Sequence, residues 1–181
     1  MKNFLVVAFS LVAFCQSNYA QKALDNKMEK KIDSLMALMT LEEKVGQMNQ
    51  YNGFWNVTGP VPKEGDASNK YEHLKKGWVG SMLNVRGVEE VRKVQKIVVE
   101  ESRLGIPLII GFDVIHGYRT QSPIPLAESA SWDLEAIEAS AAMAAEEAAA
   151  SGITWTFAPM VDISRDARWG RVMEGAGEDP Y

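Results

Sequence analysis

The chain has 181 residues, with 24 acidic against 19 basic side chains, a net charge of −5 and one cysteine. This mild acidity argues against nucleic acid or an anionic membrane surface as the main partner and suits a protein that handles neutral ligands. One cysteine excludes a disulfide framework, and two histidines without ligand spacing predict neither a metal nor another cofactor.

Residues 1–20 have the pattern of a secretory signal peptide. Lys2 supplies the positive charge, and the apolar run over residues 4–14 is too short to span a bilayer. The small residue Ala20 allows cleavage after it, so we expect a secreted protein. Cys15 leaves an alternative open, in which the protein is anchored by a lipid on that cysteine. No later apolar run approaches the ~20 residues of a membrane span.

The next part of the chain predicts two helices and a long connection. Apolar side chains recur at helical spacing over residues 27–39 and predict an amphipathic helix. Thr40-Leu-Glu-Glu43 is a capping box that opens a second, short helix. Several glycines and prolines over residues 51–77 predict an irregular connection, a kind of segment that is often functional. It contains the sequon Asn56-Val-Thr58, which we attribute to chance.

From residue 79 onward, apolar strands alternate with helices. Strands are expected at Val79–Leu83, Pro107–Phe112 and Ile153–Ala158, and helices at Val88–Arg103 and Asp133–Ser151. Asp133 is the expected N-cap of the last helix and Gly152 its terminator. Strands that are apolar throughout and alternate with helices predict an α/β fold with a parallel sheet covered on both faces.

Polar side chains follow two of these strands. Asp113 and Arg119 come after the second strand, and an arginine-rich segment that includes Arg171 comes after the third. Parallel β/α proteins place their chemistry at the carboxyl ends of strands. A carboxylate accepts hydrogen bonds from neighbouring hydroxyls, and a guanidinium presents a planar fork of donors. These residues therefore predict a sugar-binding cradle, although ion pairs with a purely structural role are also common at strand ends.

Other polar residues of these segments are expected to have structural roles. His116 should orient its loop through a ring hydrogen bond. Glu174 is a candidate partner that would fix the fork of Arg171. The remaining arginines should stiffen the segment by pairing with nearby carboxylates: Arg165 and Arg168 with Asp162, Asp166 or Glu174.

Four motifs, in order, resemble glycoside hydrolase family 3, and most closely its bacterial periplasmic β-glucosidases. They are Met39-Thr-Leu-Glu-Glu-Lys-Val-Gly-Gln-Met48, Gly105-Ile-Pro-Leu-Ile-Ile-Gly-Phe-Asp-Val-Ile-His-Gly117, Phe157-Ala-Pro-Met-Val-Asp-Ile-Ser-Arg-Asp-Ala-Arg-Trp-Gly-Arg171 and Glu178-Asp-Pro180. The resemblance implies that residues 21–181 are the incomplete N-terminal part of a (β/α)₈ TIM-type barrel. It also implies a retaining, exo-acting enzyme located in the periplasm.

The resemblance also implies roles for individual residues. In this family an Asp nucleophile and a Glu acid/base act together in the two-carboxylate scheme. Neither can be placed in this chain, so both are expected beyond Tyr181, as is the Lys-His pair of the family. The motifs map sugar-binding roles onto Asp113 and Arg171, and a six-residue spacing seen in some members maps one onto Arg119. Xylosidase-like relatives tend to have Glu in place of Asp113, so a glucoside is favoured over a xyloside.

These expectations define what the printed chain can do alone. A barrel needs ~250 residues, so this chain should be inactive without the C-terminal remainder of its own chain, and the substrate would be a β-glucoside of the whole enzyme. An alternative is a non-catalytic carbohydrate-binding remnant. A flavodoxin-like binder would require a glycine-rich phosphate turn after the first strand, and Leu83-Asn-Val-Arg-Gly-Val88 is not such a turn.

Overall fold

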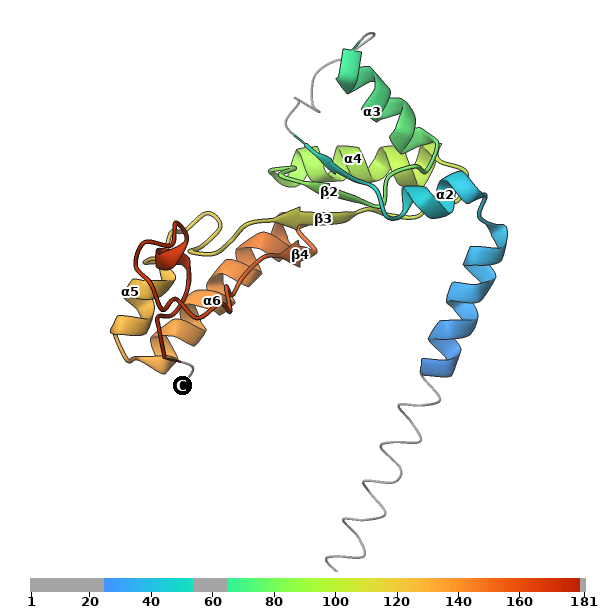
Figure 1. The fold of residues 1–181 in the computed structure, drawn as a ribbon. Helices are drawn as coiled ribbons and strands as arrows, with labels where there is room; N and C mark the ends of the chain where they lie inside the picture. The colour runs from blue at the N-terminus through green and yellow to red at the C-terminus, as the bar shows by residue number, and fades with distance from the viewer. Residues whose placement is uncertain (1–24, 54–64, 180–181) are drawn as a thin grey trace, which may run out of the picture. The chain divides into compact units, whose positions relative to one another are not determined.

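The computed structural model describes residues 25–53 and 65–179 (Figure 1). The expected signal peptide, the lipid-anchor alternative at Cys15 and the sequon at Asn56 lie outside the described residues. Within the described ranges, no helix has both the length and the apolar character needed to cross a membrane.

The chain divides into two compact units, one ending at Lys44 and the other beginning at Val45. The first unit has a helix over residues 25–38, as expected, but its apolar stripe is half exposed. The capping box is confirmed. The Thr40 N–H donates to Glu43 Oε2 at 2.8 Å, the Glu43 N–H donates to Thr40 Oγ1 at 3.3 Å, and α2 (Leu41–Gly46) begins directly afterwards.

The second unit contains a four-stranded sheet in which every strand is parallel to its neighbours, in the order β1-β2-β3-β4 (Figure 1). The strands are β1 (Gln50–Asn52), β2 (Ser81–Leu83), β3 (Ile109–Phe112) and β4 (Trp155–Thr156). Tyr51, Met82 and Ile110 form one row across the first three strands. The expected parallel α/β arrangement is confirmed, and the carboxyl ends of all four strands therefore lie at one edge of the sheet.

Helices connect the strands. They are α3 (Gly65–Lys75), α4 (Val88–Glu101), α5 (Pro125–Ala130) and α6 (Leu134–Ala150), followed by a 3₁₀ turn, η1 (Val172–Glu174). Asp133 caps α6, since its Oδ1 accepts the Ala136 N–H at 3.0 Å. Gly152 follows α6 with φ 84°, a left-handed conformation that suits glycine. Both predicted ends of α6 are confirmed.

The core lies on one face of the sheet. Met82 and Ile110 are fully buried there, together with three valines on the buried side of α4, Val91, Val94 and Val98. On the other face, Ile109 is 53% exposed and Trp155 is 43% exposed. The expectation of a sheet covered on both faces is therefore wrong for the described residues. In a barrel the inner face is covered by facing strands rather than by helices.

The expected irregular connection over residues 51–77 is wrong at both ends. β1 begins it, and α3 occupies its last part. β1 has the polar sequence Gln-Tyr-Asn, and α3 buries essentially Tyr71 and Leu74, so neither has the repeated apolar pattern that predicts an element. α5 was not expected either, although Pro125 at its start is a recognised signal for a helix N-terminus.

Candidate functional site

The segment that follows β3, residues 113–122, is the first part of the site and is called here the β3 loop. Its first residue, Asp113, is exposed, while the next residue, Val114, is buried in the core. The Asp113 Oδ1 accepts the Ile115 N–H at 2.9 Å, which orients the carboxylate. The other oxygen, Oδ2, has no hydrogen-bond partner among the described residues, so it can accept bonds from a ligand.

Backbone hydrogen bonds close the β3 loop on itself. The Gly117 N–H donates to the Val114 carbonyl at 3.1 Å, and the Ser122 N–H donates to the His116 carbonyl at 2.9 Å. Gly117 has φ 103°, and a Cβ there would lie 2.1 Å from the Thr120 carbonyl oxygen, so only glycine fits. The ring of His116 makes no hydrogen bond within the described part of the chain. The predicted ring contact is therefore wrong, because the backbone orients this loop.

Glu147, on α6, joins the β3 loop to the helix layer. Its Oε2 accepts the N–H groups of Arg119 and Thr120 at 2.8 and 2.9 Å, and its Oε1 accepts the Thr120 hydroxyl at 2.7 Å. These bonds, led by that of the Thr120 N–H, hold the pKa of the Glu147 carboxyl below its ordinary value, and the charge of Arg119 adds to the effect. No sequence pattern distinguishes Glu147, one of two adjacent glutamates on an alanine-rich helix.

Arg119 lies on the side of the β3 loop that faces α6. With Glu147, Thr120 and Ser151 it borders an open hollow of about 530 Å³. No described contact joins Arg119 to Arg171. The structure thus gives Arg119 neighbours different from those of the other two predicted sugar-binding residues.

The segment that follows β4, residues 158–179, is the second part of the site and is called here the β4 tail. Within it, η1 places Glu174 one turn after Arg171. The Arg171 Nε donates to Glu174 Oε1 at 3.1 Å, and Nη2 donates to Oε2 at 2.6 Å, so the predicted partner of Arg171 is confirmed. The remaining nitrogen, Nη1, has no partner among the described residues and can donate to a ligand.

Nearby carboxylates stabilise the charge of Arg171. The pKa of the Arg171 guanidinium is raised, first by its hydrogen bonds to Glu174 and further by the negative charges of Glu174, Asp162 and Asp113. The same hydrogen bonds lower the pKa of Glu174. The ends of the neighbouring strands β3 and β4 are therefore followed by two oriented charged groups, a carboxylate and a guanidinium. One offers an unpaired acceptor and the other an unpaired donor, which suits adjacent hydroxyls of one ligand.

Two other arginines of the β4 tail differ in their pairing. Arg168 Nε donates to Asp166 Oδ1 at 3.0 Å, which confirms one expected pair and lowers the pKa of Asp166. Arg165 makes no ion pair with any described residue, so its expected pairing is wrong. Ser164 is buried, and its hydroxyl has no hydrogen-bond partner in the described structure.

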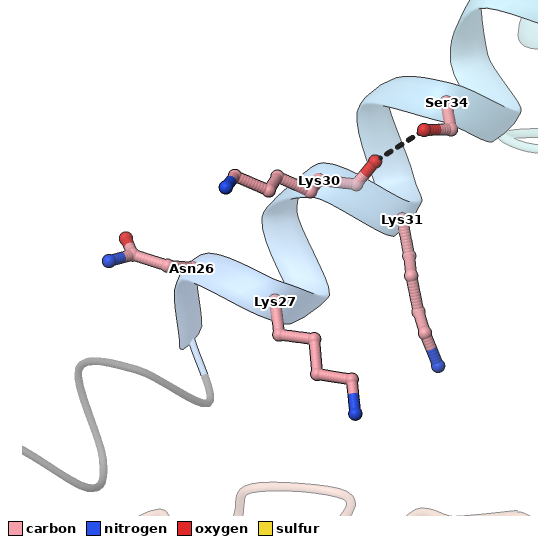
Figure 2. Close-up of a pocket in the computed structure, with 5 residues that line it drawn as sticks. All are labelled: Asn26, Lys27, Lys30, Lys31 and Ser34. Carbon is pink, nitrogen blue, oxygen red and sulfur yellow. Dashed lines mark hydrogen bonds between the residues drawn. The ribbon is translucent and has the colours of Figure 1, made fainter.

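A separate hollow of about 500 Å³ lies on the helix over residues 25–38 (Figure 2). Its lining is polar: Asn26, Lys27, Lys30, Lys31 and Ser34. The Ser34 hydroxyl donates to the Lys30 carbonyl at 2.7 Å, and the lysine side chains extend away from the helix (Figure 2). It contains none of the predicted site residues and is the solvated face of a surface helix.

Comparisons of sequence relate the chain to known glycosidases. Residues 40–181 match the glycosyl hydrolase family 3 N terminal domain. The chain is 42% identical over 151 residues to the periplasmic beta-glucosidase of Salmonella typhimurium, in an alignment that covers 83% of this chain and 19% of the relative. It is 30% identical over 171 residues to the lysosomal beta glucosidase of Dictyostelium discoideum, covering 83% of this chain and 21% of that protein.

A comparison of structures agrees with those of sequence. The crystal structure of a beta-glucosidase from Listeria innocua in complex with glucose has a TM-score of 0.72 and 39% sequence identity to this chain. The match covers 84% of this chain and 22% of that one. The chain therefore spans about a fifth of the length of the relatives it matches.

Proposed function

The chain belongs to glycosyl hydrolase family 3, and from that membership we propose that the whole protein is a retaining, exo-acting β-glucosidase. It would remove terminal β-D-glucosyl residues from glucosides or short β-glucans. The relatives that carry the match have β-glucosidase names, and one of them is a complex with glucose. The part of the enzyme printed here would belong to its barrel domain.

The position of Asp113 and Arg171 after two neighbouring strands supports the proposal for the role of this chain. The unpaired Oδ2 of Asp113 would accept hydrogen bonds from hydroxyls of the terminal glucose, and the unpaired Nη1 of Arg171 would donate to the same sugar. Glu174 supports this role, because its two hydrogen bonds fix the guanidinium and leave Nη1 for a ligand. Arg119 is a third candidate contact on motif spacing alone, and its neighbours on α6 favour a role in fixing the loop.

A retaining glycosidase needs a nucleophile and an acid/base in addition to a sugar cradle. We assign neither to a residue of this chain. The proposed task of Asp113 and Arg171 is to hold the terminal glucose while groups elsewhere in the enzyme attack its anomeric carbon and protonate the leaving oxygen. Interactions that position the sugar accelerate the reaction, because they fix the reacting atoms in a productive geometry.

Hydrolysis of an aryl β-glucoside by the whole protein tests this function. In Asp113→Ala, kcat/KM should fall at least about tenfold, since each hydrogen bond to a charged partner contributes roughly 1.5–3 kcal/mol. Asp166→Ala is the matched control, because its carboxylate pairs with Arg168 and not with Arg171. Near-normal turnover by the Asp113 variant would contradict the sugar-binding role. A wild-type protein that binds glucose without hydrolysing the glucoside would instead favour the carbohydrate-binding remnant.

We also propose export to the periplasm, supported by the signal pattern of residues 1–20 and by the periplasmic name of a relative. The lipid-anchor alternative predicts a protein bound to membranes through Cys15. Cell fractionation of the wild type and of Cys15→Ser separates the two. Both should appear in the soluble periplasmic fraction, whereas release from membranes only in the variant would establish the anchor.

A further inference from the structure

Glu147 makes an unusually complete set of contacts for one side chain. Both of its oxygens bind the β3 loop, through two consecutive backbone N–H groups and one hydroxyl, at 2.7–2.9 Å. The adjacent residue of α6, Ala148, is 1% exposed and belongs to the core. Glu147 therefore belongs to a turn of α6 that packs in the core, and it binds Arg119 and Thr120, the far side of the loop from Asp113, to that helix.

Hydrogen bonds within the β3 loop hold the residues bound by Glu147 and the segment that begins at Asp113 in one closed loop. The loop residues held by Glu147, Arg119 and Thr120, lie between the two backbone bonds that close the loop on itself, those of Gly117 and Ser122. Asp113 begins the same loop, and its Oδ1 is fixed by the loop's own Ile115 N–H. Movement of the far side would therefore be transmitted to the carboxylate.

We propose that Glu147 is a positioning residue that holds the β3 loop in the conformation in which Asp113 meets the sugar. The proposal rests on the proposed function of Asp113. Glu147 touches neither the sugar nor the reacting atoms and acts through Asp113. It adds a constraint to the packing of Tyr118, which is buried and meets the Phe112 ring at 5.2 Å. Packing anchors the middle of the loop, and the carboxylate fixes the two residues that follow.

Inhibition by glucose, measured on hydrolysis of an aryl β-glucoside by the whole protein, tests this role. Glu147→Ala should raise the inhibition constant of glucose about five- to tenfold, because Asp113 loses much of a charge-assisted hydrogen bond. Glu147→Gln should restore part of the affinity, since its amide oxygen can accept the two N–H groups and its NH₂ can donate to the Thr120 hydroxyl. Glu146→Gln, on the neighbouring exposed residue, is the matched control and should equal the wild type.

Two further variants distinguish the positioning of Asp113 from a general loss of stability and from an error in the proposed sugar site. Thr120→Val removes only the side-chain bond to Glu147 and should raise the inhibition constant less than Glu147→Ala, at a temperature where all the variants are folded. In an Asp113→Ala background, Glu147→Ala should add almost nothing if it acts through Asp113.

The outcomes are distinguishable. If Asp113→Ala weakens glucose binding but the Glu147 and Thr120 variants bind it like the wild type, the positioning role is wrong and the proposed function stands. Fully additive effects of the Asp113 and Glu147 substitutions would also overturn the positioning role. If Asp113→Ala itself leaves the inhibition constant unchanged, the proposed sugar site is wrong.

Discussion

The β3 loop and the β4 tail each follow a strand of the same sheet, yet they hold their polar side chains by different means. In the β3 loop, backbone hydrogen bonds, a left-handed glycine and buried Val114 and Tyr118 fix the chain around Asp113. In the β4 tail, exposed arginines are held by short-range ion pairs with Asp166 and Glu174.

Because of this difference, the two segments should respond differently to substitution. The β3 loop is fixed by its backbone, so it should lose its conformation when a side chain is added at Gly117 or when the Glu147 carboxylate is removed. A tail fixed by exposed ion pairs responds weakly to substitution, because water and salt screen such pairs. Substitutions in the two segments should therefore differ in their effects.

Gly117→Ala should have the largest effect. The added Cβ would lie 2.1 Å from the Thr120 carbonyl oxygen, at φ 103°, so the loop must rearrange. We expect a loss of about 2 kcal/mol or more in the free energy of unfolding, measured by thermal or urea denaturation. Gly170→Ala in the β4 tail is the control, because a Cβ there meets nothing within 4 Å. Equal stabilities of the two variants would show that the loop is not tightly fixed.

Glu174→Ala should have a moderate effect on activity. The guanidinium of Arg171 would lose both hydrogen bonds that orient it, although the pair is partly exposed. We expect kcat/KM on an aryl β-glucoside to fall about two- to fivefold, with little change in melting temperature. A fall as large as that of an Arg171→Ala variant would mean that Glu174 has a role beyond orienting the arginine.

Glu147→Gln should change how stability depends on pH. Because the pKa of Glu147 is lowered on folding, its bonds contribute fully above the ordinary value of 4.5 and are lost as the pH falls through the lower folded pKa. The melting temperature of the wild type should exceed that of the variant at pH 7, and the gap should narrow in acid. A gap that stays constant from pH 7 to about pH 3 would show that the charge of Glu147 does not stabilise the fold.

Arg168→Ala should have the smallest effect. Its side chain is 90% exposed and pairs with Asp166 two residues earlier. Exposed pairs of this kind contribute little, so activity on the aryl β-glucoside and melting temperature should both stay close to those of the wild type. A clear loss of activity would instead indicate that Arg168 contacts the ligand. It would contradict the expectation that exposed ion pairs of the β4 tail tolerate substitution.

Much of the fold could be predicted from the sequence, because its longest elements have strong local signals. α4 has apolar residues at helical spacing, and α6 has a capping aspartate and a terminating glycine. The positions of Asp113 and Arg171 also followed from simple reasoning, since each comes after an apolar strand of a parallel sheet. Three elements escaped prediction: β1, α3 and the short α5. Both β1 and α3 are polar, and their support comes from residues distant in sequence, through pairing with β2 and packing of Tyr71 and Leu74 in the core.

The internal support of the site was only partly predictable. The Arg171–Glu174 pair is local, three residues apart, so the sequence indicated it. The contact between Glu147 and the β3 loop joins residues 27 and 28 positions apart through backbone N–H groups, which every residue other than proline possesses. The side chains of the loop therefore do not indicate such a partner, and only the folded structure brings Glu147 and the loop together. The wrong expectation for the His116 ring has the same cause, because a backbone network took the place of a side-chain bond.

A crystal structure of the whole protein with bound glucose would show whether Asp113 and Arg171 hold one terminal glucose. We expect Asp113 Oδ2 and Arg171 Nη1 each to lie within about 3.2 Å of hydroxyl oxygens of the same sugar ring. Glucose bound in the barrel without contact to either residue would contradict this expectation.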